Sequence, residues 1–218
     1  MDELDAIAEC IRQDLMAKTA AREDALKLSR EAIQHCAYGI RAVHRAEFDQ
    51  ARDRLRQARL LVTRLAESLQ PFPDLYYAGY VQDAQKEYAE AAAVYALIHG
   101  DPLPSPEALE VDPAPYLNGL GETVGELRRY ALDCIRKGDV ARAETSLAQM
   151  QAIYEVLVTM DFPDAVTRGL RRTTDVTRGI LEKTRGDLTV AVRQEQLEQA
   201  LREFEQAGSK RLEIRNEK

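Results

Sequence analysis

The chain contains 218 residues, of which 45% are hydrophobic and 31% are charged, and its net charge is −7. This length suits one compact domain with a substantial core. No segment approaches the roughly 20 consecutive apolar residues that a membrane-spanning helix needs. The acidic N-terminus lacks the order of a secretory signal, and three scattered cysteines form neither a disulfide framework nor a zinc motif. We therefore expect a soluble, cytoplasmic protein without a membrane partner.

Apolar residues recur at helical spacing along most of the chain, and no segment alternates with the period of a strand. All eight prolines lie between residues 71 and 163, so the two flanking segments lack the strongest helix breaker. The spacing predicts helices, in chain order, at about residues 3–43, 47–69, 74–98, 116–136, 139–160 and 161–207. The sequence thus predicts an all-α, single-domain bundle of six or seven helices over residues 1–207.

Particular residues mark the ends of these helices. We expect Asp74 to be the N-cap of the third helix, and Asp139 to cap the fifth directly after the stop at Gly138. The last helix is expected to break near Gly186. The charged residues 208–218 are expected to form a frayed tail.

The excess of negative charge lies in the middle of the chain. Residues 71–126 hold ten acidic side chains but only one basic side chain, Lys86, whereas the flanking segments are close to neutral. Because the excess is concentrated in one segment, that segment is the first place to look for a functional site.

Two of these acids lie on the predicted third helix. Between Tyr88 and Ile98, Glu90 is the only charged residue on a helix that is apolar on every side, and such a helix is usually buried. A buried carboxylate is costly unless it is paired, protonated or bound to a cation. Glu87, three residues earlier, shares one side of the helix with Glu90.

The predicted fourth helix carries three glycines and a second acidic pair. Each glycine costs about 1 kcal/mol relative to alanine, so Gly119, Gly121 and Gly125 together indicate the close approach of a backbone or a ligand. Glu122 and Glu126 lie one turn apart, opposite the apolar stripe. If that side faces the third helix, four carboxylates converge and form a site for Mg²⁺ or Mn²⁺, which can activate water for phosphodiester hydrolysis. A solvated glutamate pair, and glycines that serve packing alone, are the alternatives.

Other enzyme classes are excluded by missing motifs. A ferritin-like di-iron centre needs Glu-x-x-His on two helices, and none of the three histidines follows a glutamate at that spacing. The chain also lacks the glycine-rich phosphate loops of P-loop and Rossmann enzymes and the nucleophile elbow of serine hydrolases.

Seven arginines lie between residues 41 and 64, against three acids. Guanidinium groups match phosphate oxygens in a bidentate manner, although a solvated charged face is the alternative. The candidate nucleic-acid-binding residues are Arg41, Arg45, Arg52, Arg56 and Arg59. A second run of arginines at residues 168–185 alternates with acids, and its spacing fits surface ion pairs.

Several segments resemble the translin family. Residues 87–91, Glu-Tyr-Ala-Glu-Ala, resemble the Glu-Tyr-x-Glu-Ala segment of its Trax branch. Residues 116–129 are similar to the Tyr-Leu-x-Gly…Gly-Glu-Leu-x-Arg block that the family shares. Gly-Asp at 138–139 follows at the expected place, and Leu-Ser-Arg at 28–30 resembles the first helix of the family. The likeness runs in order over most of the chain.

This resemblance implies a helical bundle that assembles into octamer-like shells and binds single-stranded RNA or DNA on the inner surface. It also implies a division, because translin itself binds without chemistry, whereas Trax cleaves RNA with metal-bound carboxylates. The Trax site falls on Glu87, Glu90 and Glu122. The third acid is an aspartate in Trax and is one methylene longer here. Glu126 matches a position that is occupied in both branches.

The sequence therefore predicts a homo-oligomeric, Mg²⁺- or Mn²⁺-dependent endoribonuclease acting on single-stranded RNA. Glu87, Glu90 and Glu122 are the predicted catalytic residues, and these three with Glu126 are the predicted metal ligands. One alternative is a non-catalytic, translin-like binding protein, against which the retention of all three acids argues. The other alternative is a purely structural helical scaffold.

Overall fold

The computed structural model describes the backbone of residues 2–216 and the side chains of residues 2–206. This part of the chain contains nine helices and no strand. The six long helices are α1 (Asp2–His44), α2 (Phe48–Ser68), α4 (Gly79–His99), α6 (Pro113–Arg136), α7 (Val140–Val158) and α9 (Leu170–Asn216). The three short ones are α3 (Pro73–Tyr76), α5 (Pro106–Leu109) and α8 (Asp164–Thr167). The all-α prediction is confirmed, and the long helices correspond to the six predicted segments.

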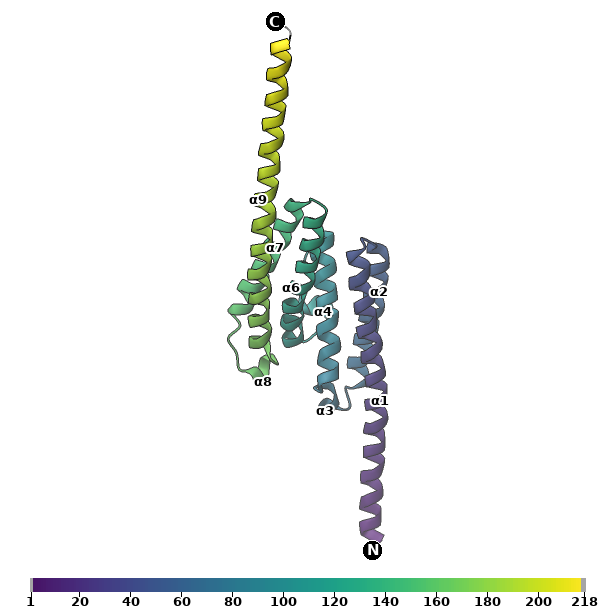
Figure 1. The fold of residues 1–218 in the computed structure, drawn as a ribbon. Coiled ribbons are helices and arrows are strands. Elements are labelled where there is room, and N and C mark those ends of the chain that lie inside the picture. Colours follow the sequence, from purple (N-terminus) through teal and green to yellow (C-terminus); the bar gives the residue numbers. More distant parts are fainter. Residues whose placement is uncertain (1, 217–218) are drawn as a thin grey trace.

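The long helices lie side by side, with α1 and α2 at one edge, α9 at the other, and α4 and α6 between them (Figure 1). One apolar core joins α4 to α1 and α2, and a second joins α4 and α6 to α7 and α9. Because α4 has neighbours on several sides, all of its residues 89–94, mostly alanines, are buried. The expectation that this helix is buried all round is therefore confirmed.

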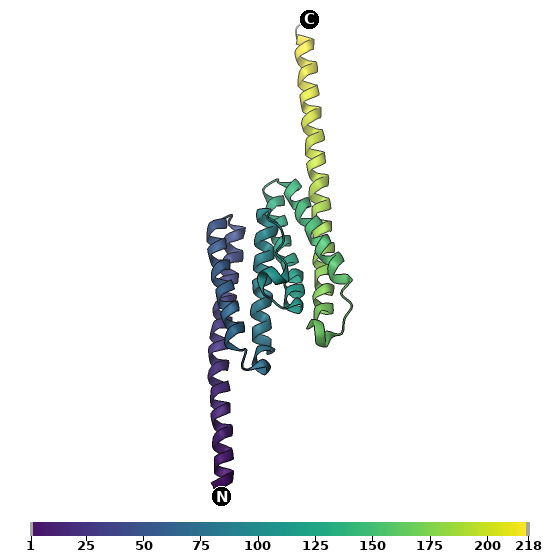
Figure 2. The same ribbon diagram turned by 180° about the vertical axis from the view of Figure 1, so that it is seen from behind.

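Two helices extend beyond the bundle at opposite ends of the molecule, as Figures 1 and 2 show. The first half of α1 carries no buried residue before Ala25, and the last buried residue of α9 in the described side chains is Leu188. Large apolar side chains are exposed on both extensions: Leu4, Ile7, Ile11, Leu15 and Met16 on α1, and Val190, Leu197, Leu201 and Phe204 on α9. None of the described helices has an apolar stretch long enough to cross a bilayer.

The start of α7 matches its prediction. Asp139 is the N-cap, and its Oδ1 accepts a hydrogen bond from the backbone N–H of Arg142 at 3.1 Å. Gly138 has a φ of +77°, which a residue with a side chain rarely adopts. The glycine therefore lets the chain leave α6 sharply and enter α7.

The prediction that Asp74 caps a continuous third helix is wrong. Pro73 begins the short α3, whose N-cap is Phe72, and α4 begins separately at Gly79. After the break, the Tyr76 hydroxyl accepts a hydrogen bond from Gln85 on α4 at 3.2 Å and donates one to Asp112, the N-cap of α6, at 3.4 Å. These part-buried polar contacts with α4 and the start of α6 thus take precedence over local capping.

The predicted break near Gly186 is also wrong, since α9 passes through it without interruption. Arg128 on α6 donates to Thr184 at 2.9 Å and to Asp187 at 2.8 Å, so contacts on both sides of the glycine hold the helix in place. The domain boundary at residue 207 stays a prediction, because side chains after residue 206 lie outside the described part. Residues 217–218 lie outside it altogether.

Gly119 sets the distance between α4 and α6. A Cβ at this position would lie 2.7 Å from the carbonyl oxygen of Lys86 and 3.0 Å from the backbone nitrogen of Glu90. Both atoms belong to the backbone of α4, which cannot move aside as a flexible side chain can. The two helices therefore touch closely at the point where α4 carries its acidic pair.

The other two glycines of α6 differ from each other. A Cβ at Gly121 would collide with the side chain of Thr173 on α9, whereas a Cβ at Gly125 would meet nothing within 4 Å. The expected close approach of a backbone is confirmed at Gly119, whereas the close neighbour of Gly121 is a side chain. The expectation is wrong at Gly125, which faces open space.

These contacts predict opposite effects for two alanine substitutions. Gly119→Ala should lower the free energy of unfolding by about 1–3 kcal/mol, because the added methyl overpacks against backbone. Gly125→Ala should raise it by about 0.5–1 kcal/mol, because alanine favours a helix and has room. Urea denaturation of both variants measures the two changes, and equal effects would contradict the close contact.

Candidate metal centre

Three carboxylates from two helices meet beside the contact at Gly119. Glu87 and Glu90 come from α4, and Glu122 comes from α6. One oxygen of each lies within 4.8 Å of an oxygen of each of the others. Because Glu122 follows Gly119 by less than one turn, the close approach of the two backbones carries its side chain toward the acidic pair.

Glu90 is the buried member of this group, with 8% of its surface exposed. Burial, followed by the charges of Glu87 and Glu122, raises the pKa of Glu90 to about 8. None of the described residues donates a hydrogen bond that would stabilise its ionised form. The metal-free group therefore keeps its proton at neutral pH, and a cation is the partner that would let it ionise.

Lys86 lies across the other two carboxylates. Its Nζ is 2.7 Å from Oε1 of Glu122 and 3.5 Å from Oε1 of Glu87. Burial by itself lowers the pKa of Lys86, but the hydrogen bond to Glu122 and the nearby acids outweigh it, so that this pKa is raised. Burial raises the pKa of Glu87 as well, and the charge of Lys86 opposes that shift. One ammonium group thus compensates two of the three acids.

Glu126, the fourth predicted metal ligand, lies outside this group of three. Its Oε2 is 2.5 Å from Nε2 of His44 at the end of α1, and 3.8 Å from the guanidinium of Arg129. The hydrogen bond from His44 lowers the pKa of Glu126. The side chain of His44 is 4% exposed, and its Nδ1 is buried without a hydrogen-bond partner. The carboxylate of Glu126 therefore ties α6 to α1.

Sequence reasoning missed His44 as a partner of Glu126. The two residues are 82 positions apart, and no motif spans them. His44 stands next to Arg45 and near Arg41 in the sequence, so local composition places it on a basic surface. Only the packing of α1 against the rest of the bundle reveals it as a buried contact.

The five candidate arginines are all exposed. Three have acidic partners: Arg45 pairs with Glu47 at 2.7 Å, Arg52 with Asp49 at 3.5 Å, and Arg59 with Glu110 at 3.6 Å. Arg41 lies 4.6 Å above the ring of Tyr38, and Arg54, which was not among the candidates, lies 5.2 Å from the same ring. Within residues 2–206, Arg41 and Arg56 form no ion pair with an acid.

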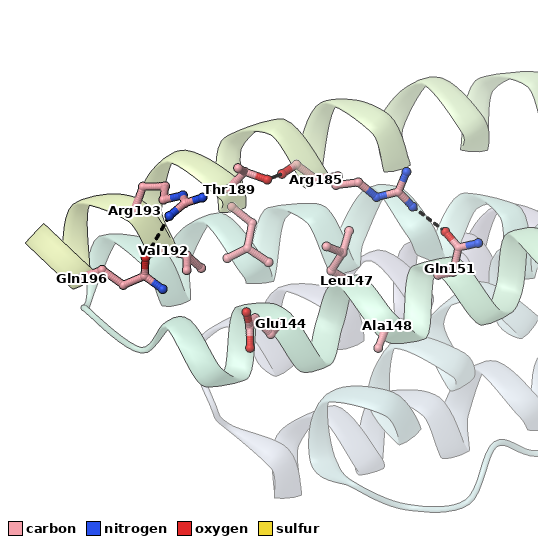
Figure 3. A pocket seen from close by; sticks show the side chains of 10 residues that line it. Glu144, Leu147, Ala148, Gln151, Arg185, Thr189, Val192, Arg193 and Gln196 are labelled. Carbon is pink, nitrogen blue, oxygen red and sulfur yellow. Dashed lines mark hydrogen bonds between the residues drawn. The ribbon is translucent and has the colours of Figure 1, made fainter.

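A separate groove of about 620 Å³ lies between α7 and α9 (Figure 3). Its floor is aliphatic, formed by Leu147, Leu188 and Val192, and Arg185 bridges it by donating to Gln151 at 2.7 Å. Glu144 is the one acid among its lining residues. The groove therefore lacks the carboxylates that would hold a divalent cation.

The fold and the site together define an all-helical protein with an acidic centre between two of its helices. No protein-family model matches the chain. It is 33% identical over 204 residues to the uncharacterized protein MJ0175 of Methanocaldococcus jannaschii, a match that covers 93% of this chain and 88% of the relative.

Solved structures show the family. A structure of AfC3PO in complex with duplex RNA superposes with a TM-score of 0.79 and 37% identity, over 85% of this chain and 96% of AfC3PO. A crystal structure of AfC3PO gives a TM-score of 0.77, 36% identity and the same coverage. The fold is also that of apo-NeC3PO, at 22% identity and a TM-score of 0.77 over 84% of this chain and 96% of that one. The chain belongs to the translin family, which includes these C3PO proteins.

The raised pKa of Glu90 predicts how stability depends on pH when divalent ions are removed with EDTA. The unfolded chain loses this proton near its ordinary pKa of about 4.5, whereas the folded protein keeps it until about pH 8. The free energy of unfolding should therefore fall as pH rises between these values. Glu90→Gln should remove that cost, and should stabilise the protein by about 1–3 kcal/mol at pH 8 and little at pH 5.

Urea denaturation at the two pH values measures this effect. Glu144→Gln, at an exposed position in the groove between α7 and α9, is the matched control and should change stability by a similar small amount at both. An equal effect of Glu90→Gln at both pH values would show that Glu90 is ionised throughout.

Proposed function

We propose that this chain is a Trax-like endoribonuclease that depends on Mg²⁺ or Mn²⁺, binds single-stranded RNA or DNA, and acts as a homo-oligomeric shell. The observation that carries the proposal is the meeting of Glu87, Glu90 and Glu122 from two helices. Membership of the translin family supports it, since a family member, AfC3PO, has been solved with duplex RNA.

The chemistry of the three side chains suits a hard divalent cation. All the ligand atoms are carboxylate oxygens, the type that Mg²⁺ and Mn²⁺ prefer, and no histidine or cysteine belongs to the group. Glu90 is buried without a donor, so its ionised form lacks a partner that a cation would supply. When bound, such an ion lowers the pKa of a coordinated water and offsets negative charge on a phosphate.

The protein positions these ligands through rigid contacts. Gly119 fixes α6 against α4, and thus fixes the backbone of Glu122 relative to that of Glu90. The hydrogen bond between His44 and Glu126 fixes α6 against α1, less than two turns beyond Gly119 and close to Glu122. Such preorganisation matters because a ligand set that is already in place loses little conformational freedom when the cation binds.

Exposed arginines on α1 and α2 supply a surface for the phosphate backbone. Contacts of this kind give affinity with little dependence on sequence, and they weaken as salt rises. Arg41 and Arg56 are the two candidates whose charge is not already offset by an acidic partner in residues 2–206. We expect these two to contribute most to binding.

The helical extensions support the proposed oligomer. Large apolar side chains stand exposed on the first half of α1 and the end of α9, beyond the bundle. Contiguous apolar surface of this kind commonly marks a protein–protein contact. Contacts between the extensions of neighbouring copies would cover it, and we propose an octamer as the closed assembly.

A second candidate is a non-catalytic, translin-like binding protein. The ion pair of Lys86 with Glu122 and Glu87 favours it, because an ammonium group can compensate these carboxylates without a metal. This candidate predicts binding of nucleic acid that EDTA leaves unchanged, and no cleavage under any condition.

A cleavage assay separates the two candidates. Single-stranded RNA labelled at one end should be cut in the presence of Mg²⁺ or Mn²⁺ and left intact with EDTA. Glu90→Gln should lower the cleavage rate by about 100-fold or more, because a neutral amide cannot replace an ionised ligand. RNA binding by this variant should stay within about twofold of the wild type. The exposed Glu144→Gln is the control and should cleave normally. Undiminished cleavage by Glu90→Gln would reject the assignment.

Binding tests the arginines independently of cleavage. The double variant Arg41→Gln/Arg56→Gln should bind a single-stranded oligonucleotide more weakly. The slope of its log affinity against log salt concentration should be shallower, by the amount that about two phosphate contacts contribute. Arg171→Gln/Arg185→Gln on α9 removes the same charge from two arginines that already pair with acids, Asp161 at 3.9 Å and Glu182 at 2.7 Å, and it should bind normally. Fluorescence anisotropy at several salt concentrations measures both, and equal losses would mean that net charge alone matters.

A further inference from the structure

Lys86 stands apart from its surroundings in both sequence and structure. It is the only basic residue among residues 71–126, which hold ten acids. Its ammonium group lies at the acidic cluster, 2.7 Å from Glu122 and 3.5 Å from Glu87. The one cation of this segment is therefore placed where the proposed divalent ion would bind.

These contacts make Lys86 and a divalent ion competitors. Glu122 and Glu87 are two of the three proposed ligands, and the Lys86 ammonium already engages an oxygen of each. Two cations on the same carboxylates repel one another at such distances. A divalent ion therefore binds both glutamates more favourably when the ammonium group moves away.

Only the side chain of Lys86 is free to move. Its carbonyl oxygen lies against Gly119, in the close contact between α4 and α6, so its backbone is held. Its side chain is 23% exposed, which places the ammonium group at the rim of the cluster. The flexible four-carbon stem can swing from the carboxylates to a group that arrives from solvent.

A phosphate of the nucleic-acid strand is the group to which the ammonium of Lys86 would move. An ammonium group is a strong point-charge partner for phosphate, and a strand held at the proposed centre presents phosphates to this rim. A phosphate that takes Lys86 away from Glu122 frees that ligand for the divalent ion. By linkage, the divalent ion then tightens binding of the strand by the same factor.

We infer that Lys86 is a built-in counter-ion that competes with the divalent cation for Glu122 and Glu87, and that a strand phosphate relieves this competition, so that metal and nucleic acid bind cooperatively. The inference rests on the proposed function, because it assigns a role to Lys86 at the same centre.

Mn²⁺ binding to the full chain, measured by electron paramagnetic resonance without nucleic acid, tests the competition. Lys86→Gln should bind Mn²⁺ about fivefold more tightly than the wild type. Arg129→Gln is the control, because it removes a positive charge that lies near Glu126 but touches neither Glu122 nor Glu87. It should change the affinity by less than about twofold. Equal or weaker binding by Lys86→Gln, or a gain that Arg129→Gln matches, would overturn the competition.

A second titration tests the cooperativity. A saturating single-stranded DNA oligonucleotide should tighten Mn²⁺ binding by the wild type about fivefold, and by Lys86→Gln much less. The same titration with Glu90→Gln, which lacks the proposed metal centre, gives the amount of Mn²⁺ that the oligonucleotide binds by itself. If Lys86→Gln keeps the full enhancement, the role of the phosphate is rejected.

The outcomes separate this inference from the proposed function. If the wild type binds Mn²⁺ no better than Glu90→Gln, the metal centre itself is rejected, and the role of Lys86 falls with it. If the wild type binds Mn²⁺ better than Glu90→Gln but Lys86→Gln equals the wild type, only the role of Lys86 is rejected.

Discussion

A carboxyl group inside the most enclosed helix is the constraint on which the rest of this structure depends. Glu90 lies on α4, among alanines that allow neighbouring helices to come close, and water cannot solvate its charge there. Three surrounding features are related to the free-energy cost of burying this carboxyl group. Gly119 lets α6 approach, Glu122 adds a second source of oxygen atoms, and Lys86 offsets part of the charge. An acidic centre that is costly to maintain thus determines the contact between two central helices.

The sequence predicts a large part of this arrangement, because the relevant signals are local. Apolar residues on every side of residues 88–98 make Glu90 conspicuous as a buried charge. Glycines in the first turns of a helix, where they lower stability, indicate a close contact, and Gly119 makes one with backbone. Helix ends marked by proline or by Gly138 and Asp139 can be located from the residues themselves. Each of these features depends on neighbours within one or two turns.

Other features depend on residues that are far apart in the chain, and the sequence does not reveal them. The partners Glu126 and His44 are 82 positions apart, and Lys86 and Glu122 are 36 apart. The contact of Tyr76 with Asp112, 36 positions away, overrides the capping preference of Asp74, and the bonds of Arg128 to α9 override the break expected at Gly186. In each case a long-range contact outweighs a local preference worth about 1 kcal/mol.

The length of α1 links two distant regions of the molecule. Its 43 residues form one unbroken helix, about 65 Å from end to end. The free half carries the uncovered apolar side chains, and the last residue, His44, holds Glu126 beside the acidic cluster. The helix therefore holds these two regions at a fixed separation. Because the helix is unbroken, its length sets the distance between the exposed apolar side chains of its free half and the acidic cluster beside Glu126.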